Sequence, residues 1–266
     1  MDATTVSRRI SRLEADISET LFEHRASGHI LTPRGQALLD HAQSMESAAI
    51  AATGNTGGQS GLASGVIRLS VSEGFGHWVI APKLRSFTDA YPGITIELIA
   101  SSGLLNPSRR EADVSIMLSR PKKGPLIVRR LIDYRLGLYA NKDDRACNKV
   151  RKTSDLKNQR LIGYVPDLIY SPELRYLEEV TGGLDVTLAS SSITAQSILI
   201  EHAAGIGILP CFIGDKNKDM KRLLSEDISI KRSFWLVMHR DMQKVARIRL
   251  FVDWLLKDGI KDDSLG

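Results

Sequence analysis

Residues 2–17 carry an apolar face at helical spacing. Val6, Ile10, Leu13 and Ile17 are separated by four, three and four positions, as one face of an α-helix requires, and Asp2 is a candidate N-cap. The opposite side of this helix is polar and carries Thr4, Thr5, Arg8, Arg9 and Arg12. Hydroxyl and guanidinium groups on a helix can contact base edges and phosphates in a DNA major groove, although an ordinary solvated helix face shows the same pattern.

A short hairpin and a second helix are predicted to follow. Residues 21–25 and 30–32 have strand composition, and the segment between them has turn composition. Thr32 can cap the next helix, with Pro33 at its first position. From there a helix is predicted over residues 33–53. Its seam residues recur at spacings of four, three and four: Leu38, Ala42, Met45 and Ala49. That spacing is typical of a coiled-coil dimerisation seam, and a helix packed on its own hairpin is the alternative.

Strand and helix signals alternate along the rest of the chain, after a glycine- and serine-rich hinge at residues 59–65. This alternation predicts an α/β sheet. The strands are expected at 66–71, 94–99, 114–118, 126–131, 134–140, 161–165, 186–189, 207–209 and 234–238. The helices are expected at 76–91, 172–180, 194–204 and 243–256.

Three loops at predicted strand ends carry hydroxyl groups. They are residues 72–76, the pair Ser101 and Ser102, and residues 190–194. Ligands of open α/β sheets bind beyond the carboxyl ends of strands, and helix N-termini with hydroxyls suit anions. The residues expected to bind a small-molecule effector are Ser72, Glu73, Ser101, Ser102, Ser192 and Thr194. Any one of these serines could instead be an ordinary N-cap, and the Glu73 carboxylate favours an effector with a donor or cationic group over an acid.

Composition and charge narrow the function classes. The chain has a net charge of +5, but residues 1–60 hold five arginines and seven acidic residues, a net charge of −2, so the excess lies outside the segment that could contact DNA. Cys147 and Cys211 stand far apart without a CxxC pair, which disfavours zinc and disulfides. No apolar run reaches the roughly 20 residues of a membrane span, and no signal-peptide pattern opens the chain. We expect a cytoplasmic protein without a membrane partner.

Catalytic motifs are not apparent. The six histidines show no HxxxH or HExxH spacing, and the chain has no GxSxG or P-loop motif. His77, near the expected effector loops, is more plausibly a helix-surface or core residue than a base. We therefore expect no enzyme activity, no catalytic residue, no metal and no cofactor.

The first sixty residues also resemble a known DNA-binding domain. The run from Val6 to Glu14, then Leu21-Phe22-Glu23 with Arg25, Gly28, Leu31-Thr32 and Gly35, resembles the winged helix-turn-helix of LysR-type transcriptional regulators. The resemblance implies that residues 2–16 are the recognition helix and residues 22–32 the wing. It also implies that the helix at 33–53 forms the dimerisation seam. The candidate DNA-binding residues are Thr4, Thr5, Ser7, Arg8, Arg9, Arg12 and His29.

The remaining two hundred residues resemble the LysR effector domain, whose fold is similar to that of type 2 periplasmic binding proteins. The landmarks are residues 65–69, 110–116, 203–210, 234–237 and the final helix. The resemblance implies residues 1–58 as a DNA-binding domain with linker helix, residues 59–65 as the hinge and residues 66–266 as the effector domain. Its subdomain I is expected at 64–137 and 234–258, and its subdomain II at 138–233. A homodimer or homotetramer is implied.

One departure from the family pattern is large. Two helices precede the recognition helix in that family, whereas Met1 here stands at the turn into it. We therefore expect a partial winged helix-turn-helix whose binding to double-stranded DNA is weakened, with a misplaced start or a truncated gene as the reason. The function expected is that of a DNA-binding regulator responding to an effector held between two α/β subdomains. The alternative is a truncated ligand-binding or dimerising module that no longer binds DNA specifically.

Overall fold

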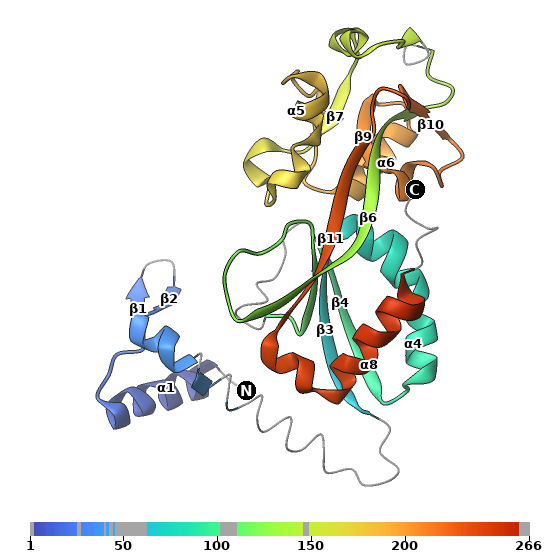
Figure 1. Cartoon of the computed structure of the whole chain (residues 1–266). Helices are drawn as coiled ribbons and strands as arrows, with labels where there is room; N and C mark the ends of the chain where they lie inside the picture. The colour runs from blue at the N-terminus through green and yellow to red at the C-terminus, as the bar shows by residue number, and fades with distance from the viewer. Residues whose placement is uncertain are drawn as a thin grey trace. The chain divides into compact units, whose positions relative to one another are not determined.

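The computed structural model of the chain describes residues 3–25, 28–39, 41–42, 45, 63–101, 111–145 and 149–260. The chain forms two compact units, Met1–Gly58 and Gln59–Gly266 (Figure 1). In the first unit, helix α1 (Ala3–Ile17) is followed by strands β1 (Phe22–Arg25) and β2 (Gly28–Leu31), which pair antiparallel. The predicted first helix and hairpin are confirmed. The predicted cap Asp2 lies outside the described residues.

Two side chains attach the elements of this unit to each other. The Glu14 carboxylate of α1 accepts hydrogen bonds from the backbone N–H groups of Leu21 at 2.7 Å and Phe22 at 3.1 Å, which holds the start of the hairpin against the helix. The Thr32 hydroxyl accepts from the Gly35 N–H at 2.9 Å, so the predicted N-cap is confirmed. The described residues 33–39, 41–42 and 45 are helical, and the rest of the helix predicted to residue 53 lies outside the described part.

The second unit is built on one mixed sheet. Within the described ranges it has nine strands, eight of them in the order β4-β3-β5-β11-β6-β9-β7-β8, with β10 paired to β6. Their bounds are β3 (Gly65–Ser72), β4 (Ile94–Ser101), β5 (Val114–Met117), β6 (Leu126–Asn141), β7 (Leu161–Gly163), β8 (Leu188–Ala189), β9 (Ile206–Pro210), β10 (Met220–Leu223) and β11 (Ile230–His239). Strands β3, β4 and β5 are parallel, as are β7, β8 and β9, while β6 and β11 run antiparallel to their neighbours.

Strands β6 and β11 connect two halves of this unit. Figure 1 shows them side by side, running from the half with β3, β4 and α4 to the half with β7, β9 and α5. The prediction of two strands at 126–131 and 134–140 was wrong, because β6 is continuous. A β-bulge lies next to the predicted break: Phe234 pairs with Ile132 but Trp235 pairs with Arg130, so one residue of β6 is extra. A bulge bends and twists a strand without ending it.

The helix predicted at 76–91 starts earlier and is irregular. It consists of α3 (Glu73–Phe75), a π-helical turn (Gly76–Ile80), a 3-10 turn (Ala81–Lys83) and α4 (Leu84–Ala90). Pro82 explains the interruption, because its ring and missing N–H break the regular ladder and the π turn absorbs the mismatch. The other helical segments are Thr153–Asn158, Pro166–Leu168, Pro172–Leu174, α5 (Tyr176–Thr181), α6 (Ile193–Glu201), α7 (Cys211–Gly214), Arg240–Lys244, α8 (Ala246–Trp254) and Leu255–Gly259.

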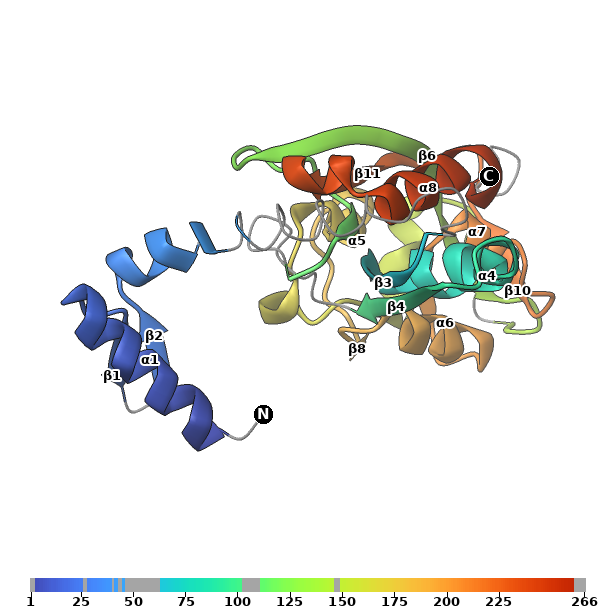
Figure 2. The same cartoon turned by 90° about the horizontal axis from the view of Figure 1, so that it is seen from below.

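Two helices close the core of the first half. Figure 2 shows α8 beside β11 and β6, and α4 beside β3 and β4. Phe87 of α4 packs against Phe251 and Trp254 of α8, each with ring centroids 5.2 Å apart. Phe87 and Phe251 are fully buried, so this aromatic contact holds both helices on the sheet. The candidate site described below lies elsewhere, at the carboxyl ends of β3 and β4.

Candidate functional site

Strands β3 and β4 end together at one edge of the sheet. Their last residues, Ser72 and Ser101, stand opposite each other in the parallel register. Ser72 is only 5% exposed, and its hydroxyl has no hydrogen-bond partner among the described residues. Ser102, the next residue proposed for the site, lies outside the described part of the chain.

Glu73 connects the two halves of the second unit. It follows β3, and its carboxylate reaches the N-terminus of α6 in the other half. One oxygen accepts a hydrogen bond from the Ser192 hydroxyl at 2.7 Å, and the other accepts from the Ile193 N–H at 3.1 Å. Ser192 is itself the N-cap of α6, because its hydroxyl accepts from the Ala195 N–H at 3.1 Å. The helix end that could hold an anion is therefore already occupied by a carboxylate of this chain.

Further contacts bring the same two segments close. The His77 ring nitrogen Nδ1 lies 3.3 Å from the Thr194 hydroxyl. A Cβ atom added to Gly74 would lie 3.2 Å from both the Ile193 and Ile213 side chains, so the backbone of α3 approaches the other half as closely as a glycine permits. Four of the six residues proposed from the sequence, Ser72, Glu73, Ser192 and Thr194, thus lie at or beside one junction.

A small cavity lies at this junction. Its volume is about 30 Å³, room for about two water molecules. Ser72, Glu73, Ser191 and the ring of Tyr134 line it together with apolar side chains. Three more tyrosines, Tyr164, Tyr170 and Tyr176, complete its polar surface. Neither Ser101 nor Thr194 is among the lining residues, so the cavity is narrower than the site predicted from the three loops.

The tyrosine hydroxyls of the cavity stay neutral. Burial raises the pKa of Tyr134, Tyr164, Tyr170 and Tyr176 above its ordinary value. The negative charge of Glu73 raises the pKa of Tyr164 and Tyr170 further. The rings of Tyr164 and Tyr176 meet edge-on, with centroids 6.0 Å apart. The cavity therefore offers neutral phenols that can either donate or accept a hydrogen bond.

Reasoning from the sequence missed these four tyrosines. Tyr164 directly follows β7, so the strand-end rule that selected Ser72 could also have selected it. Tyr134 lies inside β6 and stacks on Phe234 with ring centroids 4.3 Å apart, where it reads as a core residue. Tyr170 and Tyr176 belong to a short loop and to α5, and only the fold brings them to the cavity.

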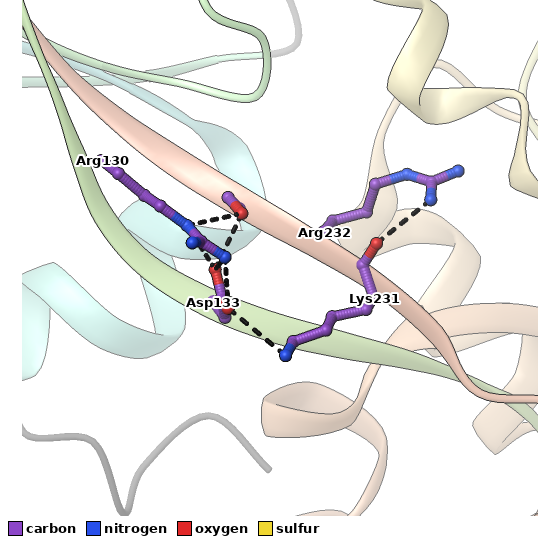
Figure 3. A network of polar contacts seen from close by, with 5 residues as sticks. Arg130, Asp133, Lys231 and Arg232 are labelled. Atoms are coloured by element: carbon purple, nitrogen blue, oxygen red, sulfur yellow. Dashed lines mark hydrogen bonds and ion pairs between the residues drawn. The ribbon is translucent and has the colours of Figure 1, made fainter.

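A second polar cluster lies where β6 and β11 join the halves (Figure 3). Arg130 donates to both oxygens of Asp133, at 2.9 Å from Nε and 2.6 Å from Nη2. The Ser233 hydroxyl donates to the same carboxylate at 2.7 Å, and the Lys231 ammonium lies 3.6 Å from it. The Ser233 hydrogen bond, followed by Arg130, lowers the pKa of Asp133 below its ordinary value. This cluster therefore joins β6 and β11 through side-chain contacts beside the bulge.

The candidate DNA-binding residues lie on an exposed surface of the first unit. Thr4, Ser7, Arg8, Arg9 and Arg12 are exposed, and Thr5 is half-buried. His29 of the hairpin is exposed too, and its ring meets Phe22 edge-on at 6.4 Å between centroids. On the other side of α1, Val6 is 39% and Leu13 42% exposed. Within the described first unit, both the polar and the apolar face of this helix are thus exposed to solvent.

The proposed dimerisation residues are partly described. Leu38 is half-buried, Ala42 is exposed and Met45 is 73% exposed. Ala49 lies outside the described residues. Elsewhere, Cys211 is buried and free, and Cys147 is not in the described part. Among the described helices, none is long and apolar enough to cross a bilayer.

Comparisons with known proteins agree with this architecture. The profile of one family, the LysR substrate binding domain, matches residues 60–259. The Mau operon transcriptional activator of Paracoccus denitrificans is 24% identical over 96% of this chain and 86% of its own length. The glycine cleavage system transcriptional activator of Escherichia coli (strain K12) is 25% identical over 94% of this chain and 83% of its own length.

Solved structures show the same fold. CrgA, a LysR-type transcriptional regulator from Neisseria meningitidis, superposes with a TM-score of 0.66 at 22% identity, over 98% of this chain and 91% of that one. The full-length virulence activator AphB from Vibrio cholerae superposes with a TM-score of 0.63 at 20% identity, over 98% of this chain and 91% of that one.

Proposed function

The chain belongs to the LysR substrate binding domain family, and from this premise we propose that it is a transcriptional regulator that binds DNA and responds to a small-molecule effector. The observation that carries the proposal is the combination of two features in one chain. One is an exposed helix with hydroxyl and arginine side chains beside a hairpin. The other is a family-matched unit whose halves meet over a small cavity. Bacterial DNA lies in the cytoplasm, and we therefore propose a cytoplasmic location for the protein.

The DNA contact is assigned to the polar face of α1. Arg8 and Arg12 lie one helical turn apart on it, and Thr4 and Thr5 lie near its N-terminal end. The spacing suits a helix that points its first turn at base edges and its arginines at phosphates. The family's winged helix-turn-helix uses its recognition helix in this way, and the hairpin from Phe22 to Leu31 takes the place of the wing.

The effector is assigned to the junction of the two halves. Parallel strands of both halves end there, and the cavity has both polar and apolar walls, as small-molecule sites have. Its present volume holds only a small group, so a larger effector would have to move the halves apart. We propose Ser72, Glu73, Ser101, Ser192 and Thr194 as residues of this site, together with Ser102 and the four tyrosines.

The test is a gel shift with DNA from upstream of the neighbouring gene at several salt concentrations. Arg8→Ala should weaken specific binding about tenfold, as loss of a base or phosphate contact does, and reduce the salt slope by about one. Arg85→Ala is the matched control, because Arg85 is an exposed arginine of the second unit, and it should bind within about twofold of wild type. Equal affinity of both variants would contradict the assignment of α1.

A second candidate is a ligand-binding or dimerising module without specific DNA binding. The exposure of Val6 and Leu13 favours it, because an isolated helix of this length is only marginally stable in water. The same gel shift separates the two candidates when the chain is compared with a version extended by the codons upstream of Met1. Specific binding that is strong only in the extended version agrees with the regulator. Its absence from both versions favours the module.

A further inference from the structure

The one charged side chain among the described residues that line the cavity is a carboxylate. Among its described lining residues Glu73 is the only ionisable acid or base apart from the tyrosines, and no lysine, arginine or histidine lines it. Glu73 forms no ion pair with any described residue. Burial is the main cause that raises the pKa of Tyr134, and the carboxylate of Glu173 adds the smallest of the contributions to it. The cation that acts on Tyr134 is Arg232, and it is paired with Glu179.

The hydrogen-bonding groups of the cavity have more acceptor than donor capacity. Each carboxylate oxygen of Glu73 accepts one hydrogen bond, so each keeps a lone pair for another donor. Ser72 and Tyr134 line the cavity, and their hydroxyls make no hydrogen bond to another described residue. An anion here would meet the Glu73 carboxylate among mostly apolar side chains, where repulsion between like charges is weakly screened. The positive end of α6, which attracts anions, is already capped by that carboxylate.

We propose that the effector of this site carries a primary ammonium group, bound by the Glu73 carboxylate and by the Ser72 and tyrosine hydroxyls. This inference rests on the proposed function, because it names the ligand class of the same site. An ammonium group supplies three N–H donors, which match the acceptors that surround the cavity. It also gains from neighbouring tyrosine rings. A group of this size suits the present cavity, and the remainder of the effector would extend toward the rim at His77 and Thr194.

The experiment is a titration of the full chain, monitored by ligand-observed nuclear magnetic resonance at constant ionic strength. The probes are ethylammonium, ethanol and acetate, which share a two-carbon skeleton and differ in charge. Tetramethylammonium carries the charge without N–H donors. A probe of three non-hydrogen atoms can reach a dissociation constant of about 1 mM at best. Ethylammonium should bind at least tenfold more tightly than each of the other three probes.

Variants locate the binding. Glu73→Gln keeps the shape of the side chain and should weaken ethylammonium at least tenfold. Ser72→Ala removes a buried hydroxyl with little steric change, should weaken it severalfold, and keeps the test valid if Glu73→Gln folds poorly. Glu97→Gln is the control, because Glu97 is an exposed carboxylate on β4 that pairs with Arg68. It should leave the titration unchanged.

Three results would overturn the inference: acetate binding as tightly as ethylammonium, equal binding by wild type and both cavity variants, or no binding of ethylammonium at concentrations up to about 100 mM, roughly 100-fold above the tightest constant it can reach. A gel shift with the version extended by the codons upstream of Met1 keeps the two proposals apart. Specific DNA binding by that version, together with any of these results, rejects the ligand class alone. Absence of specific DNA binding from that version rejects the regulator.

Discussion

Replacement of Glu73 by alanine should destabilise the second unit by weakening the junction of its halves. The carboxylate accepts from the Ser192 hydroxyl and the Ile193 N–H. With alanine at position 73, the Ile193 N–H at the start of α6 loses its acceptor, and the Ser192 hydroxyl cannot replace it because that hydroxyl already accepts from the Ala195 N–H.

The size of the effect follows from these contacts. A hydrogen bond to a charged group contributes about 1.5–3 kcal/mol when buried, and loss of a helix cap costs about 0.5–2 kcal/mol. Both Glu73 contacts are part-buried, so values near the lower end apply. We expect Glu73→Ala to lower the free energy of unfolding by about 2–3 kcal/mol. Glu73→Gln should cost about 1 kcal/mol, because its amide oxygen can still accept from the Ile193 N–H.

Urea unfolding followed by tryptophan fluorescence measures this effect in the right unit. The three tryptophans, Trp78, Trp235 and Trp254, all lie in the second unit, so the first unit contributes no signal. Glu97→Ala is the control. It removes a carboxylate from an exposed ion pair with Arg68, which is worth about 0–1 kcal/mol. A loss for Glu73→Ala no larger than that of Glu97→Ala would refute the view that Glu73 holds the halves together.

Three other predictions follow from single features. Ser115→Ala should raise the free energy of unfolding by about 1 kcal/mol in the same urea assay, because the buried Ser115 hydroxyl has no partner among the described residues. The pKa of Asp133 is lowered in the folded state. Its contribution to the free energy of unfolding is therefore present above the unfolded pKa of about 3.9 and is lost as the pH falls through the lower folded pKa. Asp133→Asn should therefore be less stable than wild type at pH 7, and the difference should shrink as the pH falls below about 3.9. A constant gap in urea midpoints would contradict this. Leu38→Asp with Met45→Asp should shift the sedimentation coefficient to that of a smaller species, and a wild type that is already monomeric at micromolar concentration would show the seam to be misread.

The periodic parts of the fold could be predicted from the sequence. The helix from Ala3 to Ile17 and strands β3, β4 and β5 have clear spacing patterns and were expected within a few residues of their bounds. Strand β10 and helix α7 were not expected. Each is four residues long, too short to show a period, and their conformations depend on pairing with β6 and packing on it.

The site was predictable only as far as local rules reach. Ser72 and Ser192 were proposed because one was expected to end a strand and the other to cap a helix, and the structure has them in those positions. The contact of Glu73 with α6 joins residues that are 119 and 120 positions apart, and no local pattern contains it. The same holds for Tyr134 and Tyr176. A buried aromatic residue looks the same in the sequence whether it packs in a core or lines a cavity.

The position of Glu73 couples the chemical class of an effector to its structural effect. A ligand changes an equilibrium between two arrangements only through a difference in its affinity for them. A donor group can use the spare lone pairs of Glu73 while the contacts with Ser192 and Ile193 persist, so it favours the closed junction. An anion competes with Glu73 for the same N–H and hydroxyl donors, and it must displace the carboxylate and separate the halves.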